Sequence, residues 1–300
     1  MEMHQLRYFV AVAETGNFTR AAKQSFVSQP SLSQQIQKLE EELGQRLLDR
    51  LGRRAELTSA GRVFFERARR ILLEVEDAAR VVREESGAGR LRIGAIPSVA
   101  PYLLPELLPR LRERLPQTRI DIYEDFRAKL IDEITAGKLD AAITTMPPEN
   151  PAIESEPLLS EPLLVAMKSS DPLADKRDLK STDLAGQRMI LLGDSSSLAL
   201  QTRRFFGDHR IDFEITSRCA QVKSVKLLIA AGLGMAILPK MAAGRDNVSG
   251  LVYREIVDAN PHREIVLVRH RQRYHGRAEE AFAEILRTLA AARAKETGSA

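Results

Sequence analysis

Uncharged hydrogen-bonding side chains gather at the start of one amphipathic segment, SQPSLSQQIQKLEEELG, which spans residues 28–44. Its apolar residues recur at steps of four, three and four, which predicts a helix with one buried face: Leu32, Ile36, Leu39 and Leu43. The opposite face and its flanks carry amides, hydroxyls, one proline and one lysine: Gln29, Pro30, Ser31, Ser33, Gln34, Gln37 and Lys38. Glutamine matches adenine with two hydrogen bonds and serine bonds several bases, so this surface suits the reading of base edges.

A basic stretch follows this polar surface. Residues 43–70 hold eight arginines against three acidic residues, in a chain whose net charge is +4. Such a cluster favours a polyanionic partner, because each neutralised phosphate releases counterions. A solvated surface without a partner is the alternative, and the arginines alone do not decide between the two.

Helix signals surround the polar segment. Residues 6–13 predict a first helix, and Asn17 is the expected cap of a second helix over residues 18–26. A short turn then leads to Ser28, the expected N-cap of the third helix. This order predicts a helix-turn-helix, in which the second helix of the pair enters the DNA major groove.

The segment LRYFVAVAETGNFTRAAKQSFVSQPSLSQQIQKLEEELGQRLLDRLGRRAELTSAG, residues 6–61, resembles the LysR-type transcriptional regulators. The resemblance implies a winged helix-turn-helix, with Arg53 and Arg54 on the wing and four recognition positions: Gln29, Pro30, Ser33 and Gln34. Leu48 stands where the family usually has phenylalanine, a departure expected to alter packing and not DNA contacts.

A heptad-like seam follows, in a helix that Thr58 is expected to cap. Its members recur at steps of four and three: Phe64, Ala68, Ile71, Val75, Ala78 and Val82. A seam of this kind favours a partner helix and hence a dimer, although an intramolecular core helix shows the same pattern. The resemblance implies a dimerising linker helix and a tetramer, which leaves homodimer and homotetramer open.

From Leu91 onward the pattern alternates strands and helices, which predicts parallel sheets covered on both faces. The segment ESEPLLSEPLLVAMK, residues 154–168, is interpreted as two crossover strands, and REIVLVRH, residues 263–270, as the start of the return to the first lobe. Two lobes joined in this way form a cleft at the carboxyl ends of their strands.

The expected fold class is therefore an α+β multidomain protein. A winged helix-turn-helix spans residues 1–58 and a linker helix with its hinge spans residues 59–89. A two-lobed α/β effector domain, similar to periplasmic binding proteins, takes residues 90–300. Lobe I is expected at about residues 90–162 and 267–300, and lobe II at about residues 163–266.

Within the family, IPSVAPYLLPELLPRLRERLP looks like the peroxide-sensing OxyR branch, in which two cysteines flank a helix of the second lobe. In this chain Ser197 and Phe206 take the two cysteine positions. Neither side chain forms a sulfenic acid or a disulfide, so the peroxide switch is not expected. Cys219 is interpreted as a small buried residue, and a redox-responsive regulator that uses Cys219 remains the alternative.

The cleft is expected to hold a small molecule, at positions that match the family's effector-lining residues. Ser98 lies where a helix begins, so its hydroxyl and nearby amides favour an anion. Ordinary helix caps are the alternative for each serine. The expected effector-binding set is Ser98, Val99, Thr144, Thr145, Ser195, Ser196, Ser197 and Gln221.

Other function classes are less well supported. The sequence has no G-x-S-x-G and no Asp and His pair that would activate Ser98 or Ser195, so an enzyme is not expected. One cysteine and five scattered histidines predict no metal site, and no cofactor is expected. No apolar run or signal peptide appears, which favours a cytoplasmic protein without membrane association.

The expected partners are double-stranded promoter DNA, a small effector and a second copy of the chain, with RNA polymerase left open. An effector-independent DNA-binding protein is the other alternative.

Overall fold

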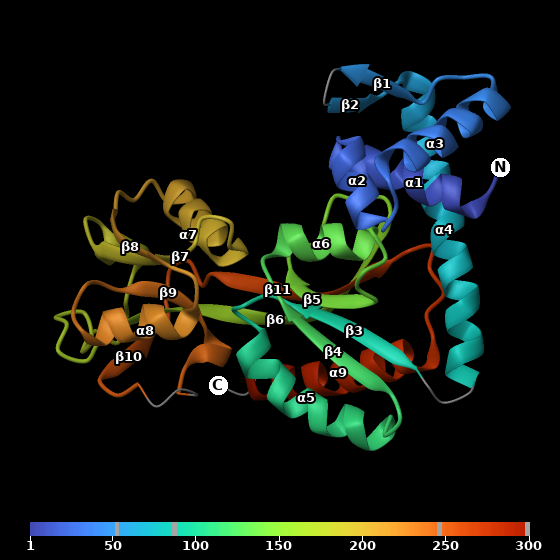
Figure 1. Ribbon diagram of the computed structural model, residues 1–300. Coiled ribbons are helices and arrows are strands. Elements are labelled where there is room, and N and C mark those ends of the chain that lie inside the picture. The colour runs from blue at the N-terminus through green and yellow to red at the C-terminus, as the bar shows by residue number, and fades with distance from the viewer. Residues whose placement is uncertain (52–53, 86–88, 245–247, 298–300) are drawn as a thin grey trace. The chain divides into compact units, whose positions relative to one another are not determined.

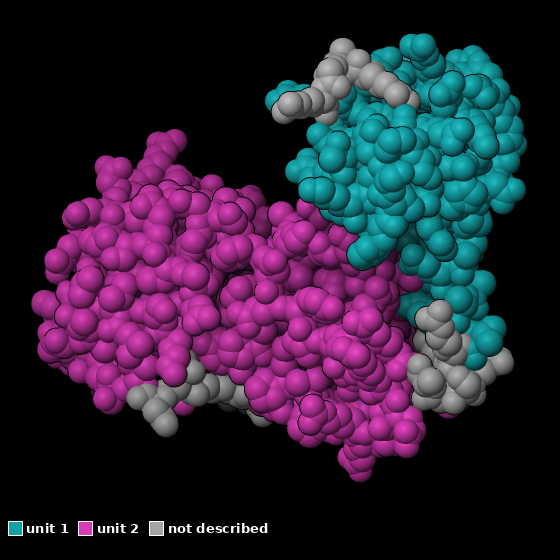
Figure 2. Space-filling view, in the orientation of Figure 1, with its two compact units in different colours: residues 1–85 teal, residues 86–300 magenta. Residues whose placement is uncertain are grey.

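The computed structural model describes residues 1–51, 54–85, 89–244 and 248–297. The chain divides into two compact units, residues 1–85 and residues 86–300, which are described separately below (Figure 2). Among the described residues, no helix is long and apolar enough to cross a membrane.

The first unit consists of three short helices, a two-stranded hairpin and one long helix (Figure 1). Its elements are α1 (Met3–Thr15), α2 (Phe18–Gln24), α3 (Gln29–Leu43), β1 (Leu48–Leu51), β2 (Arg54–Leu57) and α4 (Ser59–Glu85). Strands β1 and β2 pair antiparallel, as the wing of a winged helix-turn-helix requires.

The predicted caps of this unit are confirmed. The side chain of Asn17 accepts a hydrogen bond from the Arg20 amide at 3.0 Å, and that of Ser28 accepts one from Ser31 at 3.3 Å. The Thr58 hydroxyl accepts a hydrogen bond from the Gly61 amide at 2.9 Å at the start of α4. These side chains satisfy amides that a helix start leaves without intrahelical partners.

Helix α2 ends earlier than the sequence pattern predicted. The prediction continued it through Phe26, but α2 ends at Gln24 and Phe26 takes a left-handed conformation with φ of 56°. The amide of Val27 bonds the Ala22 carbonyl at 3.0 Å, and that of Phe26 bonds the Lys23 carbonyl at 3.3 Å. This hydrogen-bond pattern is a Schellman motif, whose left-handed residue is usually glycine. Because Phe26 takes that position here, the sequence contains no glycine signal for the end of the helix.

The core of the first unit lies between α1, α2 and α3, and α4 packs on it mainly through α1. Leu32, Ile36 and Leu39 of α3 are fully buried, as their spacing predicted, whereas Leu43, the fourth residue of the predicted buried face, is exposed by 39% at the end of the helix. The ring of Phe9 packs on those of Phe64 and Phe65 in α4, with centroids 5.3 and 6.4 Å apart.

Helix α4 uses its apolar seam in two ways. Phe64 is partly buried and Ala68 is fully buried against the core of the first unit. Further along the helix the seam residues are exposed, by 37% at Ile71, 41% at Val75 and 67% at Val82. The end of the seam nearer the hinge is therefore available to a second helix.

The second unit is built on a mixed sheet of seven strands that passes through both lobes (Figure 1). Its strands are β3 (Arg90–Ala95), β4 (Arg119–Glu124), β5 (Ala141–Thr145), β6 (Ile153–Lys168), β9 (Ala236–Pro239), β10 (Leu251–Arg254) and β11 (His262–His270). The order is β10-β6-β11-β5-β3-β4, with β9 also paired to β6. As predicted, β3 runs parallel to β4 and β5. The sequence did not predict that β11 runs antiparallel to both β5 and β6.

Each lobe adds its own helices. The remaining elements of lobe I are α5 (Ala100–Arg114), α6 (Arg127–Thr135) and α9 (Arg277–Thr297). Those of lobe II are β7 (Arg188–Leu192), β8 (Glu214–Cys219), α7 (Ser197–Asp208), α8 (Val222–Ala230) and the short helices η1 (Ser181–Leu184) and η2 (Lys240–Ala242). Strands β7 and β8 form a second, parallel pair.

The lobes are joined by β6 and β11 (Figure 1). The prediction of two crossover strands within residues 154–168 is wrong, because β6 is one continuous strand. A bulge between Leu159 and Pro157, opposite Ile265 and Val266, accommodates the proline without ending the strand.

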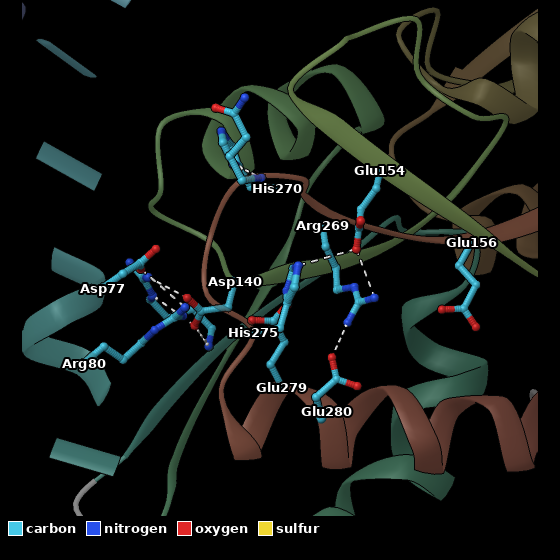
Figure 3. Close-up of polar contacts among 12 residues, drawn as sticks. Asp77, Arg80, Asp140, Glu154, Glu156, Arg269, His270, His275, Glu279 and Glu280 are labelled. Carbon is cyan, nitrogen blue, oxygen red and sulfur yellow. Dashed lines mark hydrogen bonds and ion pairs between the residues drawn. The ribbon is translucent and has the colours of Figure 1, made fainter. Parts of the chain in front are cut away.

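Ion pairs fix the return of the chain to lobe I. Arg269 of β11 contacts Glu154 of β6 at 3.0 Å and Glu280 of α9 at 2.8 Å (Figure 3). Next to them, His275 contacts Glu279 at the start of α9. These contacts hold the start of the last helix against the crossing strands.

Candidate functional site

The first turns of α3 present most of their polar side chains to solvent. Leu32, Ile36 and Leu39 anchor the opposite face in the core, so the orientation of the helix is fixed by packing. Ser33 is partly buried, and the other predicted DNA-reading residues of α3 are exposed: Gln29, Pro30, Ser31, Gln34 and Lys38.

The glutamines Gln29, Gln34 and Gln35 of α3 have different surroundings. The Gln35 side chain accepts a hydrogen bond from Gln5 of α1 at 3.3 Å and lies 3.1 Å from the His4 ring nitrogen, so it belongs to the scaffold. Within the described residues, the side chains of Gln29 and Gln34 form no hydrogen bond with the protein. Their amides are therefore available to an external partner.

The charge around this surface suits nucleic acid. Between Glu14 and Glu40 the chain has no acidic residue, and it carries Arg20, Lys23 and Lys38 there. Arg54 of the wing is exposed, and Arg53 lies outside the described residues. The surface combines uncharged groups that can read bases with cations that can bind phosphates.

Two of the predicted cleft residues, Thr145 and Ser197, meet across the lobes. The Thr145 hydroxyl, at the end of β5 in lobe I, donates a hydrogen bond to the Ser197 hydroxyl at the start of α7 in lobe II at 2.8 Å. Ser195 and Gln221 are exposed. The other members of the set are buried: Ser98, Val99, Thr144, Thr145, Ser196 and Ser197.

Ser98 contacts an arginine that sequence reasoning missed. The guanidinium of Arg263 donates hydrogen bonds to the Ser98 hydroxyl at 2.7 Å and to the Ser98 carbonyl at 3.0 Å. Because the hydroxyl accepts this bond, its hydrogen remains available for donation to a ligand.

A buried carboxylate balances that arginine. Glu161 accepts two hydrogen bonds from Arg263, at 3.0 and 3.1 Å, and one from the Met241 amide at 2.8 Å. Arg263 and Glu161 lie directly opposite each other on β11 and β6. The only signal in the sequence was a pair of opposite charges, one in each crossing strand, whose register could not be read from the pattern.

Ser197 and Phe206, the two positions that the resemblance matches to the OxyR-branch cysteines, make other contacts here. Ser197 bonds Thr145 across the cleft, while Phe206 is buried among aromatic rings. Its ring centroid lies 4.2 Å from that of Phe213 and 5.5 Å from that of Phe205. Burial raises the pKa of the Cys219 thiol, which lies at the end of β8. A raised pKa reduces the thiolate fraction that reacts with peroxide.

A pocket of about 380 Å³ opens beside the Thr145 contact. Met146 borders it from lobe I, Gln201 and Phe205 from α7, and His262 from the start of β11. The side-chain oxygen of Gln201 is buried and lacks a hydrogen-bond partner within the described residues. The pocket is thus largely apolar, with acceptor and imidazole groups at its wall.

Comparisons with known families match both units. Residues 3–62 match the model described as "Bacterial regulatory helix-turn-helix protein, lysR family". Residues 84–291 match the model described as "LysR substrate binding domain".

Individual relatives agree over nearly the whole chain. The DNA-binding transcriptional dual regulator OxyR of Escherichia coli K12 is 35% identical over 271 residues, which cover 89% of each chain. A full-length OxyR variant from Pseudomonas aeruginosa superposes with a TM-score of 0.73 at 28% identity, covering 96% of this chain and 95% of that one. Full-length CbnR complexed with its target DNA superposes with a TM-score of 0.58 at 29% identity, covering 97% of this chain and 100% of that one.

Proposed function

Because the chain belongs to the LysR family of DNA-binding transcriptional regulators, we propose that it recognises specific promoter sequences through α3 and its wing. The exposed, unpartnered amides of Gln29 and Gln34 on a helix held by its buried face carry this proposal. Such a helix can enter the major groove without rearrangement, and the arginines of the wing bind the backbone. The family consists of regulators, and an enzymatic activity is not part of the proposal.

The second unit is proposed to bind a small anion between its lobes. Ser98 can donate its hydroxyl hydrogen, and Thr145 and Ser197 would exchange their mutual bond for bonds to the ligand. The pocket beside Met146 gives room for an apolar body attached to the anionic group. Thr144, Ser195, Ser196, Val99 and Gln221 complete the proposed lining.

The ligand would act by preferring one arrangement of the lobes. A ligand that binds two arrangements equally shifts nothing, so a regulatory effector must contact both lobes differently before and after closure. The hydrogen bond between Thr145 and Ser197 is the contact whose loss or gain would report that change.

The experiment begins with genomic fragments selected by the purified full-length chain. Small carboxylates suggested by the genes next to the selected fragments are then titrated by calorimetry against the wild type and Ser98→Ala. We expect Ser98→Ala to weaken binding by about 1.5–3 kcal/mol, since it removes a hydrogen bond to a charged group. Equal affinities would return Ser98 to a purely structural role.

The names of several relatives include "hydrogen peroxide-inducible genes activator". A peroxide response is not proposed for this chain, because Ser197 and Phe206 occupy the cysteine positions and Cys219 is the one cysteine present. The exposed seam of α4 supports assembly of at least a dimer, which would place two reading helices on adjacent half-sites.

A further inference from the structure

Phe26 is the most exposed large apolar side chain of the first unit. It lies in the turn between α2 and α3, and 95% of its surface is accessible. Exposed single hydrophobic residues are common on proteins, so exposure alone would carry no argument. The backbone of the same residue supplies a second, independent observation.

Phe26 occupies a left-handed position with φ of 56°. Two other left-handed positions in this unit end α1 and α3, and both are glycines, Gly16 and Gly44, with φ of 62° and 64°. Glycine takes this conformation without a steric penalty, whereas a residue with a Cβ is strained there. At the end of α2, by contrast, the left-handed position holds a phenylalanine, whose ring is exposed to solvent.

Packing inside the unit does not explain the phenylalanine. A Schellman motif needs an apolar contact from the residue after the left-handed position, and Val27 supplies it by packing against the core. The hydrogen bonds of the turn involve backbone atoms only and would form equally well with glycine. The fold of the unit therefore gives no reason for a phenyl ring at this position.

We infer that Phe26 packs its ring against the apolar face of a deoxyribose at the rim of the major groove, an inference that rests on the proposed DNA binding. Phe26 lies three residues before Gln29, so it adjoins the end of α3 that enters the groove. The surrounding stretch, from Thr15 to Leu39, has no acidic residue and carries Arg20, Lys23 and Lys38, which favours an anionic partner such as DNA. Base edges lie deeper, within reach of Gln29 and Gln34, whereas sugars line the rim.

The test compares Phe26→Gly with the wild type on two duplexes, one selected by the wild-type chain from a random pool and one of scrambled sequence. We expect roughly tenfold weaker binding to both duplexes, because a sugar contact is independent of sequence. The salt dependence should keep its slope, since no ion pair is lost, whereas Arg54→Ala should lower the slope by about one. Phe26→Leu should retain part of the affinity.

Thermal unfolding provides the decisive control. Phe26→Gly should raise the melting temperature, because it removes the left-handed strain, while it weakens DNA binding. Unchanged affinity, a lowered melting temperature, or a loss confined to the selected duplex would overturn the inference. If the wild type selects no sequence from the random pool, the proposed function itself fails. If the wild type selects a sequence but Phe26→Gly binds it equally well, only the inference about Phe26 fails.

Discussion

Neighbouring residues of α3 have different roles: Gln34 is proposed to read DNA bases, whereas Gln35 attaches α3 to α1. We expect Gln34→Ala to cost about 1–3 kcal/mol of discrimination at one base pair of each half-site, because its amide is exposed and unpartnered. Gln35→Ala is the matched control, since Gln35 bonds α1 and should change stability more than specificity. Competition binding between duplexes that differ at one position measures both. Equal losses for Gln34→Ala on specific and scrambled DNA would exclude its reading role.

Cys219 illustrates how one residue can separate this chain from its relatives. Burial raises the pKa of its thiol, and the sequence offers no second cysteine as a resolving partner. We expect peroxide and then dithiothreitol to leave the affinity for a selected duplex unchanged, in the wild type and in Cys219→Ser alike. Fluorescence anisotropy measures that affinity. A reversible peroxide effect that disappears in Cys219→Ser would establish the redox alternative instead.

Local chemistry explains which residues could be predicted. Asn17, Ser28 and Thr58 were identified as caps because a cap depends on amides two or three residues away. The end of α2 at Gln24, which the left-handed Phe26 follows, was missed, since the usual signal for a left-handed residue is a glycine. The contact of Arg263 with Ser98 joins residues 165 positions apart, a distance over which no local pattern carries information.

Among the elements, β6 and β11 depend on the buried pair that joins them. Arg263→Met should destabilise the second unit by about 3–5 kcal/mol, because it leaves Glu161 buried and unpaired. Adding Glu161→Gln should recover much of that loss, since an amide oxygen can still accept the Met241 hydrogen bond. Urea unfolding followed by circular dichroism measures the difference.

The matched control for that experiment is an exposed pair. Arg287 of α9 contacts Glu156 of β6 at 2.6 Å, with both side chains partly in solvent. Arg287→Met should cost at most about 1 kcal/mol. Similar losses for Arg263→Met and Arg287→Met would show that the buried pair has no special weight at the crossing.

Helix α4 offers a second element-scale prediction. Val75→Asp places a charge in the exposed part of the seam and should dissociate the chain into monomers, because a buried unpaired charge opposes helix pairing. Glu76→Ala, one residue further along α4 and outside the seam, should leave assembly unchanged. Sedimentation velocity distinguishes the two states. A dimer that survives Val75→Asp would assign the seam to another role.

At the scale of the whole molecule, the sequence predicted the order of helices and strands better than the way in which the strands connect the two lobes. The helix-turn-helix and the parallel strands β3, β4 and β5 follow from local periodicity and were recovered. The crossover was misjudged as two strands within residues 154–168, whereas pairing with β11 holds β6 together as one strand across a bulge. The continuity of β6 depends on its pairing with β11, and a local sequence pattern does not reveal which strands pair.

The most direct measurement of the central claim is the ratio of affinities for two duplexes at one fixed salt concentration. The first duplex is a genomic fragment selected by the full-length chain, and the second has the same composition in scrambled order. The account predicts at least about a thousandfold tighter binding to the selected duplex, and a smaller ratio for Gln34→Ala. Equal affinities of the wild type for the two duplexes would contradict sequence-specific recognition by α3.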